Sequence, residues 1–353
     1  LMNKKQILIL SVILGVLAFG VLVKSWIRSA QETVLPVQGE GVILADFDPA
    51  KIERILISRS LTQTEDGSAG SSVELIKEKG AWKVSSLWNA GADPAKVEKF
   101  LGEFHAVRGE LRGAEKKLFP DFGIQENEAF SIKFFNAKGA LISEFLIGTK
   151  QAGVNGFFVR RPSSEEVYWA NLDLAEILGM NEDVLPEAPS GDVWADLRLF
   201  KLDPEKVTRI TVFQMKEDQK NMIAGLERTI DPRDPSKNSW KFLRKEMTLP
   251  LDPAKIARFI AVMNSLRAEK VMDPRGEGYG LEKPAWQLAV TEGNKKTILN
   301  AGSENEKEGR RFVSRPGDPT VFALLSPFFE DLSVDDTHFV KDNAPDGESR
   351  KAA

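Results

Sequence analysis

Cysteine is absent from the sequence, and histidine is nearly absent. The chain has 353 residues, of which none is Cys and two, His105 and His338, are His. Disulfide bonds and thiolate metal sites are therefore excluded, and two imidazoles are too few for a usual structural zinc site. A serine-hydrolase elbow, a Walker loop and a dinucleotide-binding fingerprint are missing as well. We therefore expect a protein that is not an enzyme, with no catalytic, cofactor-binding or metal-binding residues and no cofactor.

Long apolar runs are also rare, and a single one occupies the start of the chain. Residues 7–23 carry no charge, with Lys4 and Lys5 before them and Lys24 and Arg28 after them. These 17 residues are close to the shortest helix that crosses the hydrocarbon layer. We expect an uncleaved transmembrane anchor. A cleaved signal peptide and a buried core helix are the alternatives, although the small residues that a cleavage site needs lie inside the run.

The charge balance limits the location and the partners. The four basic residues around the apolar run are the only charged residues before position 30, so the rest of the chain has a formal charge of −8, against −4 for the whole chain. Charges of both signs are interspersed, whereas proteins that bind nucleic acid normally present a basic stripe. We expect no nucleic-acid partner. A short N-terminal anchor before a large domain predicts a single-pass protein of the bacterial inner membrane, with most of the chain in the periplasm.

The sequence repeats itself after about 155 residues. Seven landmarks recur in the same order, with offsets between 154 and 159: Asp48-Pro-Ala-Lys51 as Asp203-Pro-Glu-Lys206, Trp82-Lys83 as Trp240-Lys241, Asp93-Pro-Ala-Lys96 as Asp252-Pro-Ala-Lys255, Phe122-Gly123 as Tyr279-Gly280, Ile147-Gly148 as Ala301-Gly302, Phe158-Val159-Arg160-Arg161-Pro162 as Phe312-Val313-Ser314-Arg315-Pro316, and Val167-Tyr168 as Val321-Phe322. A collinear series of this kind indicates an internal duplication.

The landmarks predict the fold of each half. In Asp-Pro-x-Lys the aspartate can cap a helix that begins with proline. The apolar residues that follow Asp93 and Asp252 recur at i, i+3, i+4 and i+7, which is typical of an amphipathic helix. Short alternating runs between turn residues, such as residues 130–135 and 286–291, predict strands. We expect an α+β fold in which each half is a mostly antiparallel sheet packed with an amphipathic helix, and a second short helix at residues 172–178 and 321–330.

These observations divide the chain into seven parts. We expect a cytoplasmic N-terminus, a transmembrane anchor, a linker, a first repeat domain, a linker rich in Pro and acidic residues, a second repeat domain and a disordered tail. Their bounds are residues 1–6, 7–23, 24–44, 45–180, 181–194, 195–340 and 341–353.

Four side chains that recur in the repeat are candidates for binding. Trp82 and Trp240 begin a predicted strand and can stack on a sugar ring, although a core tryptophan is the more common reading. Arg161 and Arg315 stand before a proline at the same place in each half, where they either support the strand end or contact an anion. Carboxylate pairs for glycoside chemistry are not selected by any spacing among the 52 acidic residues.

The landmarks resemble the domain-of-unknown-function 4340 family over roughly residues 45–335. The resemblance is carried by the tryptophan strand, by Asp-Pro-Ala-Lys, by Tyr279-Gly280-Leu281-Glu-Lys-Pro284, by Ile147-Gly148 and by Phe-Val-x-Arg-Pro. In the first half Phe122-Gly123-Ile124 lacks the proline, so its assignment depends on the duplication. Members look like membrane-anchored bacterial proteins that are often encoded beside gliding-motility-type ABC transporter components.

This resemblance implies partners but no activity. We expect a non-enzymatic, periplasmic accessory or binding protein that is attached to the membrane through residues 7–23 and associated with ABC transporter permease or auxiliary subunits. An envelope glycan-binding or hydrolytic module is one alternative, and a structural spacer is another.

Overall fold

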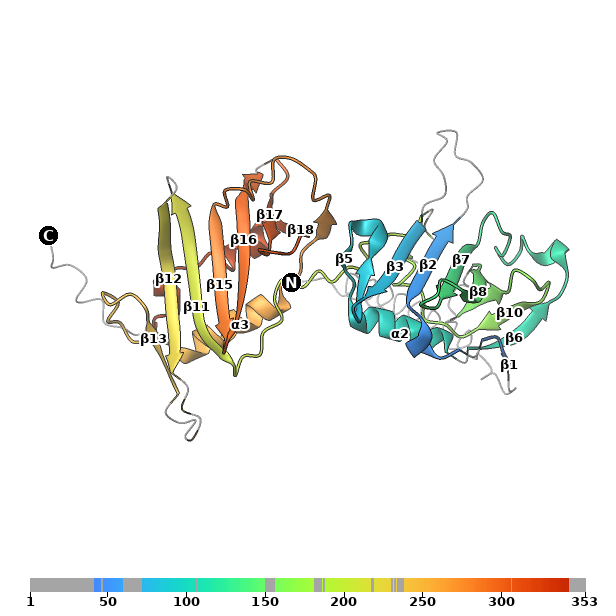
Figure 1. Ribbon diagram of the computed structural model, residues 1–353, viewed down its shortest axis with the longest axis horizontal. Coiled ribbons are helices and arrows are strands. Elements are labelled where there is room, and N and C mark those ends of the chain that lie inside the picture. The colour runs from blue at the N-terminus through green and yellow to red at the C-terminus, as the bar shows by residue number, and fades with distance from the viewer. Residues whose placement is uncertain are drawn as a thin grey trace, which may run out of the picture.

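The computed structural model describes residues 41–342 apart from residues 46, 60–71, 106, 150–155, 181–185, 187, 217–218, 230, 232, 234–237 and 306. Two antiparallel sheets follow one another along the chain (Figure 1). The anchor expected at residues 7–23 and residues 343–353 of the tail expected at residues 341–353 lie outside the described part. Within that part, no helix combines the length and the apolar composition needed to cross a membrane.

The first sheet has ten strands, in the order β1-β6-β10-β9-β8-β7-β2-β3-β4-β5. Their bounds are β1 (Val42–Ile43), β2 (Arg54–Arg59), β3 (Ser72–Glu78), β4 (Ala81–Val84), β5 (Ala90–Gly91), β6 (Arg108–Gly113), β7 (Phe130–Phe135), β8 (Leu141–Ile147), β9 (Phe157–Arg160) and β10 (Val167–Ala170). Short 3-10 helices lie at η1 (Pro49–Lys51), η2 (Ser85–Leu87) and η3 (Lys116–Leu118).

The second sheet has eight strands, in the order β13-β12-β11-β15-β16-β17-β18-β14. Their bounds are β11 (Val207–Lys216), β12 (Gln219–Thr229), β13 (Ser239–Phe242), β14 (Lys270–Met272), β15 (Trp286–Glu292), β16 (Lys295–Asn305), β17 (Arg310–Ser314) and β18 (Val321–Leu325). The strands of this sheet follow, in this direction, the same spatial order as β4-β3-β2-β7-β8-β9-β10-β6 of the first sheet. The predicted duplication and the α+β fold with two tandem antiparallel sheets are therefore confirmed.

One helix packs against each sheet, and its start is set by the Asp-Pro pair. Helix α2 (Pro94–Phe104) begins after Asp93, whose carboxylate accepts a hydrogen bond from the backbone N–H of Ala95 (3.1 Å). Helix α3 (Pro253–Ser265) begins after Asp252 in the same way, with Ala254 as the donor (2.9 Å). These bonds satisfy backbone groups that the first helical turn leaves unpaired. The predicted caps are thus present in both halves.

The apolar stripe of each helix forms the centre of the core. In α2 the side chains of Phe100 and Phe104 are fully buried and contact Phe134 of β7, with ring centroids 5.8 and 5.2 Å apart. Phe104 also contacts Phe145 of β8 (5.1 Å). Strand β7 alternates buried and half-buried residues along its length, as expected for a strand with one face on the core.

The chain after each sheet returns to close its own domain, and we call residues 191–196 and 336–341 the closing segments. Trp194 is 1% exposed and packs edge-to-face on Phe100, while Phe339 does the same on Phe259 of α3 (ring centroids 5.0 and 5.4 Å apart). The N–H of Asp93 donates to the carbonyl of Trp194, and that of Asp252 to the carbonyl of Phe339, both at 2.8 Å. The last residues of the predicted linker 181–194 therefore belong to the core of the first domain.

The chain before each sheet is likewise equivalent, and we call residues 42–44 and 197–199 the leading segments. In the first domain Ile43 pairs with Arg108, and the N–H of Leu44 donates to Val107 (2.8 Å). In the second domain Arg198 pairs with Arg267, and the N–H of Leu199 donates to Leu266 (3.5 Å). Because residue 196 closes one domain and residue 197 opens the next, no spacer separates the two.

The glycines of the repeat allow a loop to cross a strand end at close range. A Cβ atom on Gly148 would meet the carbonyl oxygen of Phe122, and one on Gly302 would meet that of Tyr279. In the first domain Phe122 accepts a hydrogen bond from the N–H of Thr149 (3.0 Å). This contact explains why Phe-Gly or Tyr-Gly and Ile-Gly or Ala-Gly recur together in each half.

One of the two expected short helices is absent, and the other is shorter than expected. Residues 172–178 form no helix, because a single hydrogen-bonded turn ends at Gly179 with a φ of +70°. Residues 321–325 are strand β18, and only α4 (Ser326–Glu330) is helical in that stretch. Both segments contain apolar residues at helix-like spacing, but the first is too short to continue and the second is fixed by its pairing with β17 and β14.

Candidate functional site

The two tryptophans of the repeat lie on equivalent strands and are half-buried. Trp82 in β4 and Trp240 in β13 both pack against the core. A cation from the neighbouring strand lies near each ring: the Lys77 ammonium is 5.9 Å from the ring centroid of Trp82, and the Arg228 guanidinium is 5.9 Å from that of Trp240. Both strands stand at the far end of their sheets from β9 and β17. The structure therefore does not bring the tryptophans together with the repeated arginines.

The two repeated arginines bind the backbone of the leading segments. Arg161 follows β9 and donates a hydrogen bond to the carbonyl oxygen of Leu44. Arg315 follows β17 and donates to the carbonyl oxygen of Leu199 (3.5 Å). Each arginine thus attaches the first residues of its domain to the loop between two later strands.

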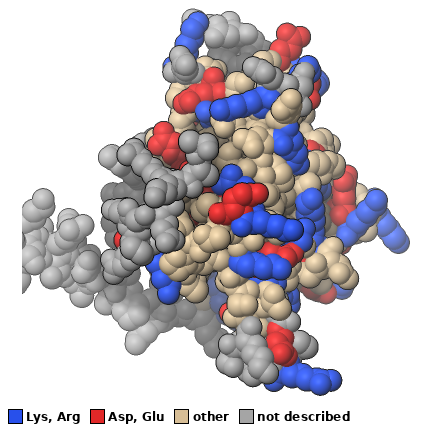
Figure 2. Space-filling view, turned by 90° about the vertical axis from the view of Figure 1, so that its left-hand side faces the viewer, with Lys and Arg blue, Asp and Glu red and all other residues tan. Residues whose placement is uncertain are grey.

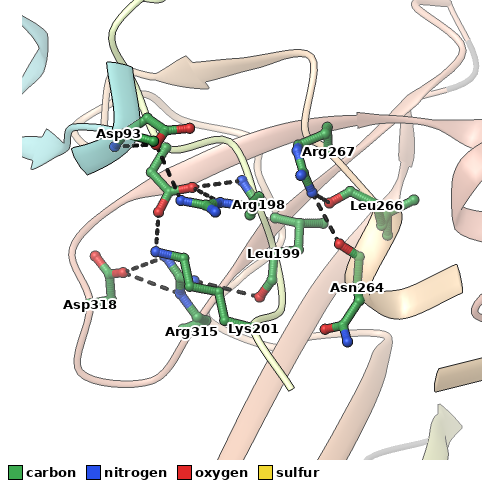
Figure 3. A network of polar contacts seen from close by, with 11 residues as sticks. Asp93, Arg198, Leu199, Lys201, Asn264, Leu266, Arg267, Arg315 and Asp318 are labelled. Atoms are coloured by element: carbon green, nitrogen blue, oxygen red, sulfur yellow. Dashed lines mark hydrogen bonds and ion pairs between the residues drawn. The ribbon is translucent and has the colours of Figure 1, made fainter. Parts of the chain in front are cut away.

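The junction between the domains holds a network of charged residues from both halves (Figure 3). Arg198 contacts the carboxylate of Asp196 through Nε (2.7 Å) and that of Asp93 through Nη2 (3.4 Å). Lys201 reaches the other oxygen of Asp196 (2.5 Å). Asp93 caps α2 of the first domain, whereas Lys201 leads into the second, so these contacts connect the two domains.

The carboxylate of Asp196 is the centre of this network. Its side chain is 13% exposed, and burial raises its pKa. Hydrogen bonds from Arg198 and Lys201 act in the opposite direction and together prevail, so the pKa of Asp196 lies below its usual value. The hydrogen bond from Arg198 to Asp196 likewise raises the pKa of the guanidinium. Asp196 is therefore ionised at neutral pH and binds both cations.

The second domain fixes the same segment from its other side. Asn264, near the end of α3, accepts a hydrogen bond from the N–H of Leu202 (2.8 Å) and donates one to its carbonyl (2.9 Å). Arg267 donates to the carbonyls of Asn264 and Leu266 at the helix end (3.1 and 3.3 Å). A cation at this position also interacts favourably with the helix dipole. The segment between the domains is thus held by both of them.

Concave surfaces of the described part of the chain include three with room for a small group. Two of them, of about 280 and 390 Å³, share Arg161 and Ser163 in the first domain. The third, of about 1050 Å³, is an open groove along α3 that is lined by Phe259, Lys255 and His338, among others.

Neither histidine has the surroundings of a metal ligand. The Nδ1 atom of His105 lies 2.7 Å from the carbonyl oxygen of Phe47, and His338 packs on Phe259 and Phe339. Burial and the nearby charges of Lys255 and Arg258 lower the pKa of His338. Among the described residues, no group of His, Cys, Asp and Glu is arranged to hold a metal ion.

The surface charge follows the mixed pattern of the sequence. Figure 2 shows the end of the molecule at which β12 and β13 of the second domain lie. Basic and acidic side chains are interspersed over this end. Several of these charges form ion pairs, for example Lys241 with Glu227 (3.1 Å). Cations that are neutralised by neighbouring acids do not form the stripe that a phosphate backbone requires.

The sequence did not identify the charged residues of the junction. Asp93 was recognised as a helix cap, but its contact with Arg198 spans 105 positions and has no local signature. The one available signal was the repeat itself, because Leu44-Ala-Asp-Phe-Asp-Pro49 aligns with Leu199-Phe-Lys-Leu-Asp-Pro204. Extending the repeat to Leu44 and Leu199 would have shown that residues 197–199 open the second domain as residues 42–44 open the first.

Comparison with known proteins supports the same repeat. A family model, described as domain of unknown function DUF4340, matches residues 82–241 and again residues 240–343. The two matches begin at Trp82 and Trp240, so the unit of the family starts at equivalent strands in both halves. Neither the comparison with curated proteins nor the comparison with solved structures finds a match. Since the matched segments cover most of the sequence, the chain belongs to the DUF4340 family.

Proposed function

We propose that this protein is a non-enzymatic accessory protein that binds an ABC-type transporter or another complex of the bacterial envelope. Residues 7–23 attach it to the inner membrane, and the two repeat domains occupy the periplasm. The proposal joins the apolar run and the family resemblance to the architecture of the two domains.

The observation that carries the proposal is the use of the repeated charged residues. Asp93 and Asp252 cap helices, and Arg161 and Arg315 bind the carbonyls of the leading segments. The same holds for the repeated lysines of α2 and α3, since Lys96 donates to the carbonyl of Val193 (2.9 Å) and Lys255 to that of Val340 (2.8 Å). A duplicated active site would direct such groups at a substrate, whereas here they hold the chain's own backbone.

The junction supports a role in which two domains present their surfaces together. Backbone hydrogen bonds join residues 191–199 to both domains, for instance from the N–H of Asp196 to Gly91 and from the N–H of Ala268 to Leu197, both at 2.8 Å. The ion pairs of Asp196 and Arg198 add to these bonds. Two domains connected in this way can bind one large partner at two places, which increases the overall affinity without a tighter single contact.

Purification from native membranes tests this proposal. The full-length chain is solubilised in mild detergent, and its co-purifying proteins are identified by mass spectrometry beside a fragment without residues 1–29. We expect transporter subunits with the full-length chain and a marked loss with the fragment. We also expect the fragment to fold and to fail to support function in cells.

Two results would contradict the proposal. Full function of the fragment would show that attachment to the membrane is not needed. Recovery of the chain without a partner, together with binding or cleavage of envelope glycan by the same preparation, would instead favour the glycan-directed alternative.

A further inference from the structure

The two repeated arginines differ in their ion pairing. In the second domain Arg315 contacts the carboxylate of Asp318 through Nη2 (3.0 Å) and Nε (3.3 Å). In the first domain Arg161 donates to the carbonyl of Leu44, and no acidic side chain among the described residues pairs with it. Among the described residues, Arg315 therefore has a carboxylate in direct contact and Arg161 does not.

Ser164 occupies the position of Asp318 in the loop of the first domain. The N–H of Ser164 donates to the carbonyl of Arg161, as the N–H of Asp318 does to that of Arg315, both at 3.0 Å. The Ser164 hydroxyl accepts from the N–H two residues later (3.1 Å), and the Asp318 carboxylate does the same (3.0 Å). The two loops thus have the same backbone arrangement, and the carboxylate is the group that differs.

The surroundings of Arg161 can accommodate another molecule. Arg161 lines both cavities of the first domain. Leu44, Phe145 and Val159 line one of them, and Phe47 and Ile142 line the other. Glu166 and Glu144 also line this space, but the Glu166 carboxylate accepts a hydrogen bond from the hydroxyl of Tyr168 (2.6 Å) and that of Glu144 contacts Lys133 (3.2 Å). The guanidinium of Arg161 is exposed beside the apolar part of the lining, where a carboxylate can form a charge-assisted hydrogen bond with it.

The rim of this site exposes apolar side chains. Val42 and Ile43 of β1 are 56% and 46% exposed, and Leu111 of the adjoining β6 is 51% exposed. Clustered exposed apolar residues at the edge of a sheet are typical of surfaces that bind other proteins.

The second domain shows what covers the equivalent surface. There Leu197 and Arg198 take the positions of Val42 and Ile43, and Arg198 contacts two carboxylates of the first domain, those of Asp93 and Asp196. The covering group is therefore the start of helix α2 together with the closing segment of the first domain, and both carry an acidic side chain. The presence of Ile43 at the position of Arg198 makes the corresponding surface of the first domain more apolar, and Arg161 lies beside it.

We propose that Arg161, the two cavities beside it and the exposed edge of β1 form a docking site for a protein segment that carries an Asp or Glu carboxylate between apolar side chains. The carboxylate binds the guanidinium of Arg161, at the place that Asp318 takes beside Arg315. The apolar neighbours contact Val42, Ile43 and Leu111. The identity of the partner rests on the proposed function. The site adds to that function the surface and the chemistry of the contact.

Methyl NMR of the full chain in mild detergent tests this site. Ile43 and Ile142 provide labelled methyl groups at its rim and in its wall, and the probe is the peptide acetyl-Leu-Asp-Leu-amide. We expect saturable shifts of both methyl signals with a Kd of about 1 mM, as suits one charged contact with a small apolar area. The peptide with Asn in place of Asp should bind about tenfold to hundredfold more weakly, because it lacks the charged hydrogen bond.

Three variants separate this site from a structural effect. Ser164→Asp supplies an internal carboxylate and keeps Arg161 in place, so it should abolish binding while the fold is retained. Arg161→Gln should abolish binding as well. Arg315→Gln removes the equivalent arginine of the second domain and should leave the affinity unchanged.

Several outcomes would overturn the proposal. They are equal binding of the Asp and Asn peptides, full binding by Ser164→Asp, or an equal loss in Arg315→Gln. Propionate that binds as tightly as the peptide would show that the site takes a free small carboxylate and not a protein segment. The titration contains no transporter. A negative titration would therefore not contradict co-purification of the subunits, and a negative co-purification would not contradict the titration.

Discussion

Removal of the Trp194 side chain should unfold the first domain selectively. The indole is 1% exposed and packs edge-to-face on Phe100 of α2. Truncation of a buried Trp to Ala costs about 3–5 kcal/mol in general. The two backbone hydrogen bonds beside it, from Asp93 to Trp194 and from Asp196 to Gly91, remain possible in Trp194→Ala. We therefore expect a loss of about 3 kcal/mol, at the lower end of that range.

Hydrogen exchange measured by mass spectrometry resolves the two domains. A loss of about 3 kcal/mol corresponds to about a hundredfold faster exchange of the most protected amides. In Trp194→Ala this change should appear in peptides from α2 and β7, with little change in α3 and β15. Phe339→Ala should give the reverse pattern, because Phe339 takes the equivalent place on Phe259.

Phe328→Ala is the matched control, since this aromatic side chain is 48% exposed. It should alter exchange in neither helix. If Trp194→Ala leaves α2 unchanged, residues 191–196 do not close the first domain and the assignment of the closing segments is wrong. Equal acceleration in α2 and α3 would show that the two domains unfold as one unit.

Further predictions concern the glycines, the junction and the groove. Gly302→Ala should lower the unfolding free energy of the second domain by about 1–3 kcal/mol, because its Cβ meets the carbonyl of Tyr279. Gly102→Ala on the open face of α2 should instead raise the unfolding free energy of the first domain by about 0.5–1 kcal/mol. Urea unfolding of both variants checks these two values. Asp196 has a folded-state pKa below its usual 3.8, so its ionised form stabilises the protein above about pH 4 and this stabilisation is lost as the pH falls through the folded-state pKa. Asp196→Asn should remove that part of the acid-induced decline in the unfolding free energy. The pKa of His338 is lowered in the folded protein, so on acidification the unfolded chain binds a proton at this residue before the folded protein does. The unfolding free energy should therefore decline as the pH falls below 6.5. His338→Gln should reduce this decline in thermal unfolding curves.

The strands with strong alternation were predicted accurately. β7 (Phe130–Phe135) has the predicted bounds, and β15 (Trp286–Glu292) is one residue longer than the predicted 286–291. Both lie inside their sheets, and β7 buries one face, so its sequence carries the period of two that a half-buried strand requires. The helices after Asp93 and Asp252 were predictable for a similar reason, because both the cap and the apolar stripe are local signals.

Four strands at or near the ends of the sheets could not be predicted in this way. β6 has the sequence Arg108-Gly-Glu-Leu-Arg-Gly113, in which a single large apolar residue points to solvent. β1 and β5 are two residues long, and β14 is three. These strands are defined by their partners: β6 exists because β10 and β1 lie on either side of it. The site residues were missed for the same reason, since Arg198 meets Asp93 only after both domains have folded.

The comparison of the two halves separates residues that build the fold from residues that have become free to vary. A duplicated chain begins with two copies of every contact, and a contact that the fold needs is kept in both. The helix caps, the contacts of the closing segments and the bond from the repeated arginine to the leading segment are of this kind. Where the copies differ, one of them has lost a structural partner or gained another role.

The differences collect at the leading side of the first domain. Arg198 is replaced there by Ile43, and Asp318 by Ser164. In the second domain this side is covered by the first domain, so its arginines must be neutralised within the chain, and Asp93, Asp196 and Asp318 supply the carboxylates. In the first domain no preceding repeat supplies such a cover among the described residues. Among the described residues, Arg161 thus has no carboxylate in direct contact and lies beside an exposed apolar edge, and this is the surface that we propose as the docking site.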